Sequence, residues 1–223
     1  LPYIGYYQLA NCADVFVLYD DVTYIKGGWI NRNRLLVNGK HSLFTLPLEN
    51  PSSHVLIRDI RVGANVERWR SRFLRTLQNA YSRAPHFEEV EALVRRVVER
   101  QSVWLVDWLR TAHRETFGCL GIETRLVESS SVYGNARLKG QERLIDICQR
   151  EKADEYINAM GGMNLYSKDA FAARGIPLRF LKSGNTEYAQ FGAPFVPWLS
   201  MIEVMMFNSP EAIAELLTQS TLV

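Results

Sequence analysis

The sequence predicts an α/β fold: a mostly parallel, Rossmann-like sheet flanked by helices, with a β-hairpin and a helical insertion. Short apolar, β-rich runs such as residues 15–18 are typical of buried strands. After residue 118, strand-like and helix-like segments alternate, as they do in parallel sheets whose two faces are covered. Residues 66–118 keep a helical period throughout. We therefore expect residues 1–223 to form a single domain that carries 66–118 as its helical insertion.

The composition indicates a globular protein with a sizeable core. The chain has 223 residues, of which 47% are hydrophobic and 22% charged, enough for one large domain. Its formal net charge of +2 is too balanced to indicate nucleic acid or a membrane surface as a partner. The three cysteines lie far apart and cannot all pair, and neither a signal peptide nor a membrane-spanning apolar run is visible. We therefore expect a cytoplasmic protein.

The first residues predict a short helix that leads directly into the strand at 15–18. Ile4, Tyr7 and Leu9 lie near helical spacing. A short helix followed at once by a buried strand is typical of a βαβ unit with a right-handed crossover. We therefore expect a strand before Leu1 that is missing from this chain.

A β-hairpin is predicted around Asn38 and Gly39, because both residues accept the positive φ of a type I′ turn. They lie between strand-like runs at 34–37 and 43–48. Residues 57–62 alternate apolar and charged side chains, which predicts another, half-exposed strand.

The insertion carries apolar residues at helical spacing in three pieces. Such a stripe is typical of core packing rather than of a functional site. Its members are Trp69, Phe73, Leu77, Tyr81, Val90, Leu93, Val94, Val97, Val98, Trp104, Leu105, Trp108 and Leu109. Beyond the insertion we expect strands at 123–128, 155–158 and 177–181, and helices at 141–150, 167–174, 199–206 and from Ser209 onward.

The stretch from Tyr19 to Asn33 is the predicted active or binding site, because it leaves a buried strand and gathers acids, a base, amides and aromatic residues. Asp20 and Asp21 suit a general base, or a ligand of an amine or a metal; an Asx turn or a helix N-cap is the structural alternative. Adjacent strand residues point to opposite faces, so we expect one acid to face the ligand and the other to support it. Lys26 completes the candidate catalytic set.

The second half of this stretch is rich in hydrogen-bond donors. Asn31, Arg32 and Asn33 suit a phosphate or a carboxylate. Trp29 or Tyr24 would stack on a sugar or a base. The alternatives are a solvated turn hinged on two glycines and a tryptophan that belongs to the core.

Two further segments are candidates for the same site. A predicted strand ends at Asn158 and leads into Gly161 and Gly162, where the bare backbone can approach a ligand closely. Lys139 and Arg143 lie one helical turn apart, within reach of one anion, with an ordinary surface pair as the alternative.

A late polar and aromatic loop, which includes Gln190 and Ser200, is a candidate lid or pocket wall, with ordinary packing as the alternative. The four histidines show no zinc-site spacing and the cysteines have no nearby histidine signature. We therefore predict no metal site and no cysteine nucleophile, and the sequence identifies no cofactor.

Five blocks of sequence span nearly the whole chain. They are PYIGYYQL with ADVFVLYDDVTYIKGGWINRNRLLVNGK and LFTLPL, then W with AY..AP.F, then RLIDIC with ADEYINAMGG and a later Y, then GI.L.FL, and finally Y.QF with FVP.LS.I.V.MFN. In this order they resemble the WbqC-like family of bacterial proteins. The resemblance implies a role in the biosynthesis of O-antigen, lipopolysaccharide and other surface sugars.

Two departures from the family pattern concern the candidate site. The family begins with a strand and a Gln-Pro-aromatic-Pro segment, whereas this chain starts at the last part of it, Leu1-Pro2-Tyr3. Where the family commonly has a histidine in its aromatic helix, this chain has Phe73. If that histidine is catalytic in the family, this chain lacks the catalytic residue.

The family's blocks coincide with the candidate site. The coinciding positions are Tyr19, Asp20, Asp21, Tyr24, Lys26, Trp29, Asn31, Arg32, Asn33, Asn158, Gly161, Gly162, Gln190 and Ser200. We expect them to form a composite pocket at the edge of the parallel sheet.

The resemblance and the site favour a transferase that moves an acyl or aminoacyl group to the amine of a nucleotide-linked amino sugar. In this hypothesis, Asp20 or Asp21 binds or deprotonates the amine. The phosphates would be held by Lys26, Arg32, Lys139 and Arg143. The alternatives are a non-catalytic sugar-nucleotide-binding or assembly protein of the same pathway, and a nucleotidyl- or adenylyl-transfer enzyme. The expected partner is a small molecule, a sugar nucleotide, rather than nucleic acid or a membrane.

Overall fold

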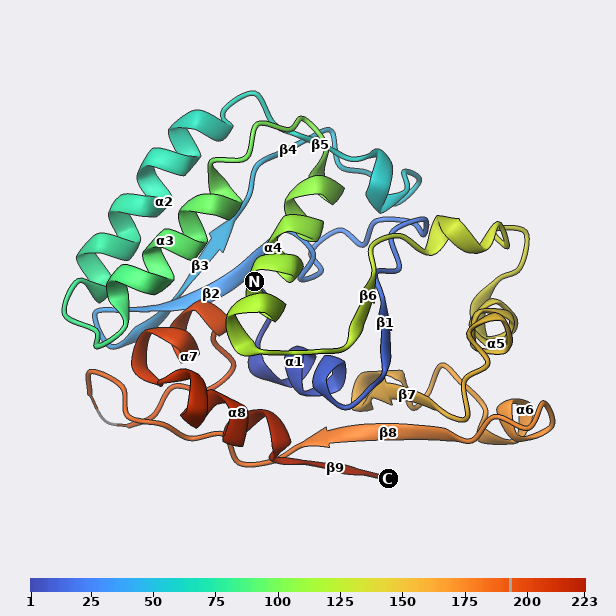
Figure 1. Ribbon diagram of the computed structural model, residues 1–223. Coiled ribbons are helices and arrows are strands. Elements are labelled where there is room, and N and C mark those ends of the chain that lie inside the picture. The colour runs from blue at the N-terminus through green and yellow to red at the C-terminus, as the bar shows by residue number, and fades with distance from the viewer. Residues whose placement is uncertain (193) are drawn as a thin grey trace.

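The chain folds into a mixed α/β structure, which the computed structural model describes at residues 1–192 and 194–223. This confirms the α/β class. Figure 1 shows three helices, α2, α3 and α4, packed over a β-hairpin, with short parallel strand pairs on the other side of the molecule. The helices of the described residues are α1 (Ile4–Asn11), α2 (Val66–Tyr81), α3 (Phe87–Val98), α4 (Leu105–Leu120), α5 (Gly140–Glu151), α6 (Lys168–Ala172), α7 (Met201–Phe207) and α8 (Pro210–Thr218).

The strands form small sheets, so the large Rossmann-like parallel sheet expected from the sequence is wrong for the part of the chain described. The pairs are β1 (Val15–Val17) with β6 (Arg125–Val127), β2 (Arg32–Val37) with β3 (Lys40–Thr45), β4 (Leu48–Glu49) with β5 (Arg61–Val62), and β7 (Tyr156–Ala159) with β8 (Leu178–Ser183) and β9 (Ser220–Leu222). Two of these pairings, β1–β6 and β7–β8, are parallel. Helix α1 lies against β7 and β8 and leads into β1. The two parallel pairs therefore meet through the side chains of α1 rather than through a shared ladder.

The predicted hairpin is confirmed. β2 and β3 are antiparallel, and Asn38 and Gly39 turn the chain with φ angles of 52° and 72°. The strand expected at 57–62 is mostly wrong, because its first residues form a 3-10 helix, η1 (Ile57–Asp59). The backbone N–H of Arg58 donates to the carbonyl of Asp20 at 2.9 Å. This segment thus supports the candidate site loop instead of extending a sheet.

The three-piece helical block is confirmed as α2, α3 and α4. Helix α3 packs against both of its neighbours, and the apolar stripe faces inward apart from Trp104, which is exposed. Phe73, Leu77, Leu93 and Trp108 are all buried. These helices and the hairpin belong to one hydrophobic core that also includes α7 and α8.

The C-terminal half follows the predicted order of elements. Ser209 caps α8, since its hydroxyl accepts the N–H of Ala212 at 3.3 Å and Pro210 occupies the first turn. Strand β9, which the sequence did not indicate, closes the edge of β8. A second, smaller core lies around Ile145, Phe171 and Phe180. Among the helices described, none is both long and apolar enough to cross a membrane.

Candidate functional site

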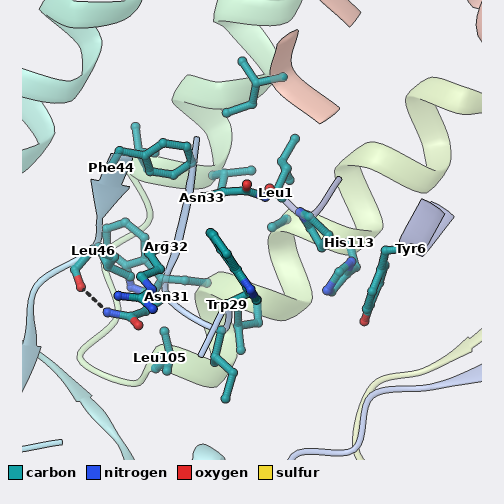
Figure 2. Close-up of a pocket in the computed structure, with 18 of the residues that line it drawn as sticks. Leu1, Tyr6, Trp29, Asn31, Arg32, Asn33, Phe44, Leu46, Leu105 and His113 are labelled. Atoms are coloured by element: carbon teal, nitrogen blue, oxygen red, sulfur yellow. Dashed lines mark hydrogen bonds between the residues drawn. The ribbon is translucent and has the colours of Figure 1, made fainter. Parts of the chain in front are cut away.

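A cavity of about 730 Å³ lies between the β2–β3 hairpin, the first residues of the chain and the helices α2 to α4. Figure 2 shows Trp29 in its middle, with Arg32 and Asn31 on one side and His113 and Tyr6 on the other. Six predicted site residues line it: Tyr19, Asp20, Trp29, Asn31, Arg32 and Asn33. The predicted site stretch from Tyr19 to Asn33 therefore contributes to a cavity.

Asp20 is held at the cavity wall by donors from two distant segments. It is 3% exposed, and Nη2 of Arg110 on α4 donates to its Oδ2 at 3.0 Å. The hydroxyl of Ser129 donates to its Oδ1 at 2.7 Å, and the backbone N–H of Ser130 donates to the same oxygen at 3.2 Å. Because Oδ2 carries a single donor in the described structure, it keeps room for a ligand N–H.

Asp21 points away from the cavity into a buried ion pair. Nη2 of Arg143 donates to both of its carboxylate oxygens at 2.6 Å, and the Ser130 hydroxyl also donates to it. Burial alone would raise the pKa of Asp21, but the hydrogen bonds from Ser130 and Arg143 and the charge of Arg143 lower it. Nε of Arg143 donates to Asn135 at 2.9 Å, and the guanidinium stacks over the ring of Tyr19. Asp21 and Arg143 thus hold the site loop against α5.

Trp29 is flanked by two arginines of β2. The guanidinium carbon of Arg34 lies 4.9 Å from the ring centroid and that of Arg32 lies 5.4 Å from it. Nε of Arg32 donates to the Gly28 carbonyl at 2.8 Å. Within the described residues, neither arginine forms an ion pair with a carboxylate. Both side chains are half-buried, so this wall of the cavity carries uncompensated positive charge.

The amides beside these arginines shape the mouth of the cavity. Tyr24 donates its hydroxyl proton to Asn31 Oδ1 at 2.8 Å, and Asn31 Nδ2 donates to the Leu46 carbonyl at 2.7 Å. Asn33 Nδ2 and the Ser200 hydroxyl both donate to the carbonyl of Leu1, at 2.7 and 2.8 Å. Tyr24 and Ser200 are therefore adjacent to the lining without being part of it.

The remaining candidates lie outside the cavity. Lys26 and Lys139 are exposed. Asn158 Oδ1 accepts the N–H of Ala159 at 2.7 Å, and a Cβ on Gly162 would lie 2.7 Å from Asn158 Nδ2. Gly162 thus makes room for Asn158.

The other two outlying candidates also lack contact with the cavity. Gly161 is exposed in the 3-10 helix η3 (Met160–Gly162) that follows β7. Gln190 closes its own loop through bonds to the backbone of Val196 at 2.9 and 3.1 Å. Neither Gly161 nor Gln190 lines the cavity. Burial raises the pKa of Tyr19, and Tyr166, a hydrogen-bond partner of Asn158, lies near enough to Tyr19 to help raise it.

His113 on α4 lines the cavity, although it lies outside the predicted site. Its ring stacks on Tyr6 with 5.1 Å between centroids, and its Nδ1 has no hydrogen-bond partner among the described residues. Burial lowers the pKa of His113 to about 3, so the imidazole is neutral at pH 7. Two sequence signals point to this wall: His113 follows Leu109 by four residues on the apolar stripe, and Arg34 follows Arg32 by two on a strand.

The helices supply the rest of the wall, and it is apolar. Trp69 and Phe73 come from α2, Leu93 and Val97 from α3, and Trp108 from α4. The aromatic stripe expected to be core therefore also lines the cavity. In the described part of the chain, no group of three or more histidine, cysteine or acidic side chains is placed to hold a metal ion.

The chain is similar to one protein family and to a mycobacterial protein. The model of the WbqC-like protein family matches residues 1–215. A Mycobacterium tuberculosis (strain ATCC 25618 / H37Rv) protein named "Uncharacterized protein Rv1507c" is 29% identical over 215 residues, which are 95% of this chain and 91% of that protein. No solved structure matches the chain.

Proposed function

The chain belongs to the WbqC-like protein family, and on that premise we propose that it is an enzyme of bacterial surface-sugar biosynthesis. It transfers an acyl or aminoacyl group to the amine of a nucleotide-linked amino sugar. The substrate binds at the cavity wall formed by Asp20, Trp29, Arg32 and Arg34.

The observation that carries the proposal is the pair of arginines stacked on Trp29. A half-buried guanidinium without a carboxylate partner is costly unless an anion compensates it. Arg32 and Arg34 come from the same face of β2, two residues apart, so they present parallel donors to one group. Phosphate oxygens accept such donors well, and Trp29 offers an aromatic surface for a sugar or a base.

Asp20 is the proposed partner of the sugar amine. The amine nitrogen attacks the carbonyl carbon of the activated donor, the leaving group departs with the bonding electrons, and Oδ2 of Asp20 takes the proton that the nitrogen loses. Asp21 and Arg143 position the loop that carries Asp20. Lys26, exposed on the same loop, meets the outer phosphate of the nucleotide in this proposal.

A single-turnover assay tests the proposal. It uses UDP- and dTDP-linked amino sugars with acyl and aminoacyl thioesters or esters, and mass spectrometry detects the amide product. Asp20→Asn should abolish product formation while the protein still binds the sugar nucleotide. The exposed Asp154→Asn serves as a matched control and should leave turnover unchanged. If Asp20→Asn turns over at the wild-type rate, the role of Asp20 is wrong.

A non-catalytic sugar-nucleotide-binding or assembly protein is the second candidate. It is favoured by the engagement of both acids in ion pairs, Asp20 with Arg110 and Asp21 with Arg143. Such a protein would gain thermal stability from a sugar nucleotide that it never converts. Release of pyrophosphate from ATP would instead favour the third candidate, nucleotidyl or adenylyl transfer.

A further inference from the structure

We propose that the helical part of the cavity receives a linear, apolar acyl chain. The inference rests on the proposed function and deepens it, because it names the donor class: a medium- or long-chain acyl group rather than an acetyl or aminoacyl group. The structure supports it through the separation of apolar and charged side chains around one cavity.

The cavity has two chemically different walls. The residues that α2, α3 and α4 contribute are all apolar or aromatic, apart from His113. The charged side chains of the lining are Asp20, Arg32 and Arg34, which come from another stretch of the chain, although Asp20 is bonded to Arg110 of α4 at 3.0 Å. A ligand that matches both walls has an anionic polar head and an apolar tail.

An aminoacyl group fits this interior poorly. Its ammonium would need an acid or water, since an unpaired buried charge is strongly disfavoured. Asp20 is the acidic residue of the described lining, and it already accepts donors from Arg110 and Ser129. An acetyl group would leave most of the roughly 730 Å³ unfilled. A hydrocarbon chain fills the space without bringing charge into it.

In Figure 2, His113 lies on the side of the cavity away from Arg32. Its ring is buried and its Nδ1 has no partner in the described residues. A neutral imidazole offers one hydrogen bond without a charge. The imidazole of His113 can therefore form a hydrogen bond with the amide of an acylated product. The hydrocarbon tail of that product would then lie among Val94, Val97 and Leu109.

A chain-length series tests the inference in two arms. The first arm measures by calorimetry the Kd of UDP-linked amino sugars that carry N-acetyl, N-hexanoyl or N-decanoyl groups. The second arm uses acyl-pantetheine thioesters of the same lengths. Each added methylene should tighten binding about four-fold until the cavity is filled. The unacylated UDP-linked amino sugar is titrated separately and tests the proposed function.

A cavity-filling variant locates the effect. Leu109→Phe narrows the apolar wall and should weaken the decanoyl ligand much more than the acetyl ligand. Leu165→Phe makes the same change at a position that is 69% exposed and outside the lining, and should change neither. A melting curve shows that both variants fold.

The outcomes are distinguishable. The acyl-chain site is supported if affinity rises with chain length in either arm and if Leu109→Phe lowers the chain length at which this rise stops. This holds even if the unacylated sugar nucleotide does not bind and the proposed function fails. Affinity that is independent of chain length in both arms overturns the acyl-chain site. In that case, binding of the unacylated sugar nucleotide would still support the proposed function.

Discussion

The guanidinium of Arg34 lies over the indole of Trp29, with its central carbon 4.9 Å from the ring centroid. Among the described side chains no carboxylate neutralises it. Trp29 itself is 55% exposed, so the stacked pair is open to solvent on one side and to the cavity on the other. An anionic ligand can therefore reach this charge without displacing another protein group.

Arg34→Gln should weaken binding of a UDP-linked amino sugar roughly ten- to a hundredfold, the range expected for a lost charge-assisted hydrogen bond. The melting temperature should hardly change, since the side chain forms no ion pair in the described structure. Calorimetric titration measures the loss. Arg75→Gln removes an exposed arginine from α2 and should bind like the wild type. Equal affinity of both variants would remove Arg34 from the site.

Arg143→Met should destabilise the fold by about 3–5 kcal/mol, because it leaves the Asp21 carboxylate buried without its partner. The double variant with Asp21→Asn should recover most of this loss. Urea unfolding measures both. Arg150→Met breaks a half-exposed pair with Asp146, and should cost at most about 1 kcal/mol. A loss no larger than that of Arg150→Met would show that the buried pair contributes little.

Glu203→Gln should stabilise the protein at alkaline pH. Glu203 is fully buried in α7, neither of its carboxylate oxygens has a partner in the described structure, and burial raises its pKa to about 7. An unfolded glutamate titrates near 4.5. Between pH 4.5 and about 7, Glu203 is protonated in the folded state and ionised in the unfolded state. The free energy of unfolding therefore falls as the pH rises through about 7.

The gain from Glu203→Gln should therefore be small at pH 5 and reach roughly 3 kcal/mol at pH 8. Unfolding free energies at the two pH values measure it. An exposed glutamate on α8, Glu215→Gln, should show no such trend. A gain that is equal at both pH values would contradict the titration of Glu203.

His113→Phe should protect the protein against acid. The folded pKa of His113 is about 3 and the unfolded value is 6.5, so the unfolded state binds more protons below pH 6.5. Wild-type stability therefore falls as pH decreases from about 6.5 towards 3, by roughly 3 kcal/mol at pH 4. Urea unfolding at pH 4 and pH 8 measures the difference in unfolding free energy, and this loss at pH 4 should be absent from the variant. The exposed His54→Phe is the control and should keep the slope.

Local patterns predicted the helices and the hairpin well, because their signals repeat within one element. Trp69, Phe73, Leu77 and Tyr81 mark four turns of α2, and Asn38 with Gly39 specifies a tight turn. The sheet was predicted less well, since strand pairing is decided by residues far apart in the chain. The three-residue strand β1 pairs with β6 about a hundred residues later.

The candidate site was predicted only in part, again because some of its contacts join residues that lie far apart in the sequence. The stretch from Tyr19 to Asn33 was found because its polar residues are adjacent in the sequence. The arginines that hold its two acids lie 90 and 122 residues away, so their pairing with Asp20 and Asp21 could not be predicted from the sequence, although Arg143 was itself a candidate. The helical wall was missed as a site because an apolar stripe has the same period whether it faces a packed core or a cavity.

The two walls of the cavity come from two separate stretches of the chain: the charged wall from residues 19–34 and most of the apolar wall from α2, α3 and α4. Substitutions in the helices can therefore alter the depth of the cavity while the charged wall stays the same. In the proposed transfer reaction, relatives with an identical charged stretch can evolve different preferences for the size of the transferred group. A designer can likewise retune that preference by exchanging a few helical side chains in one contiguous segment.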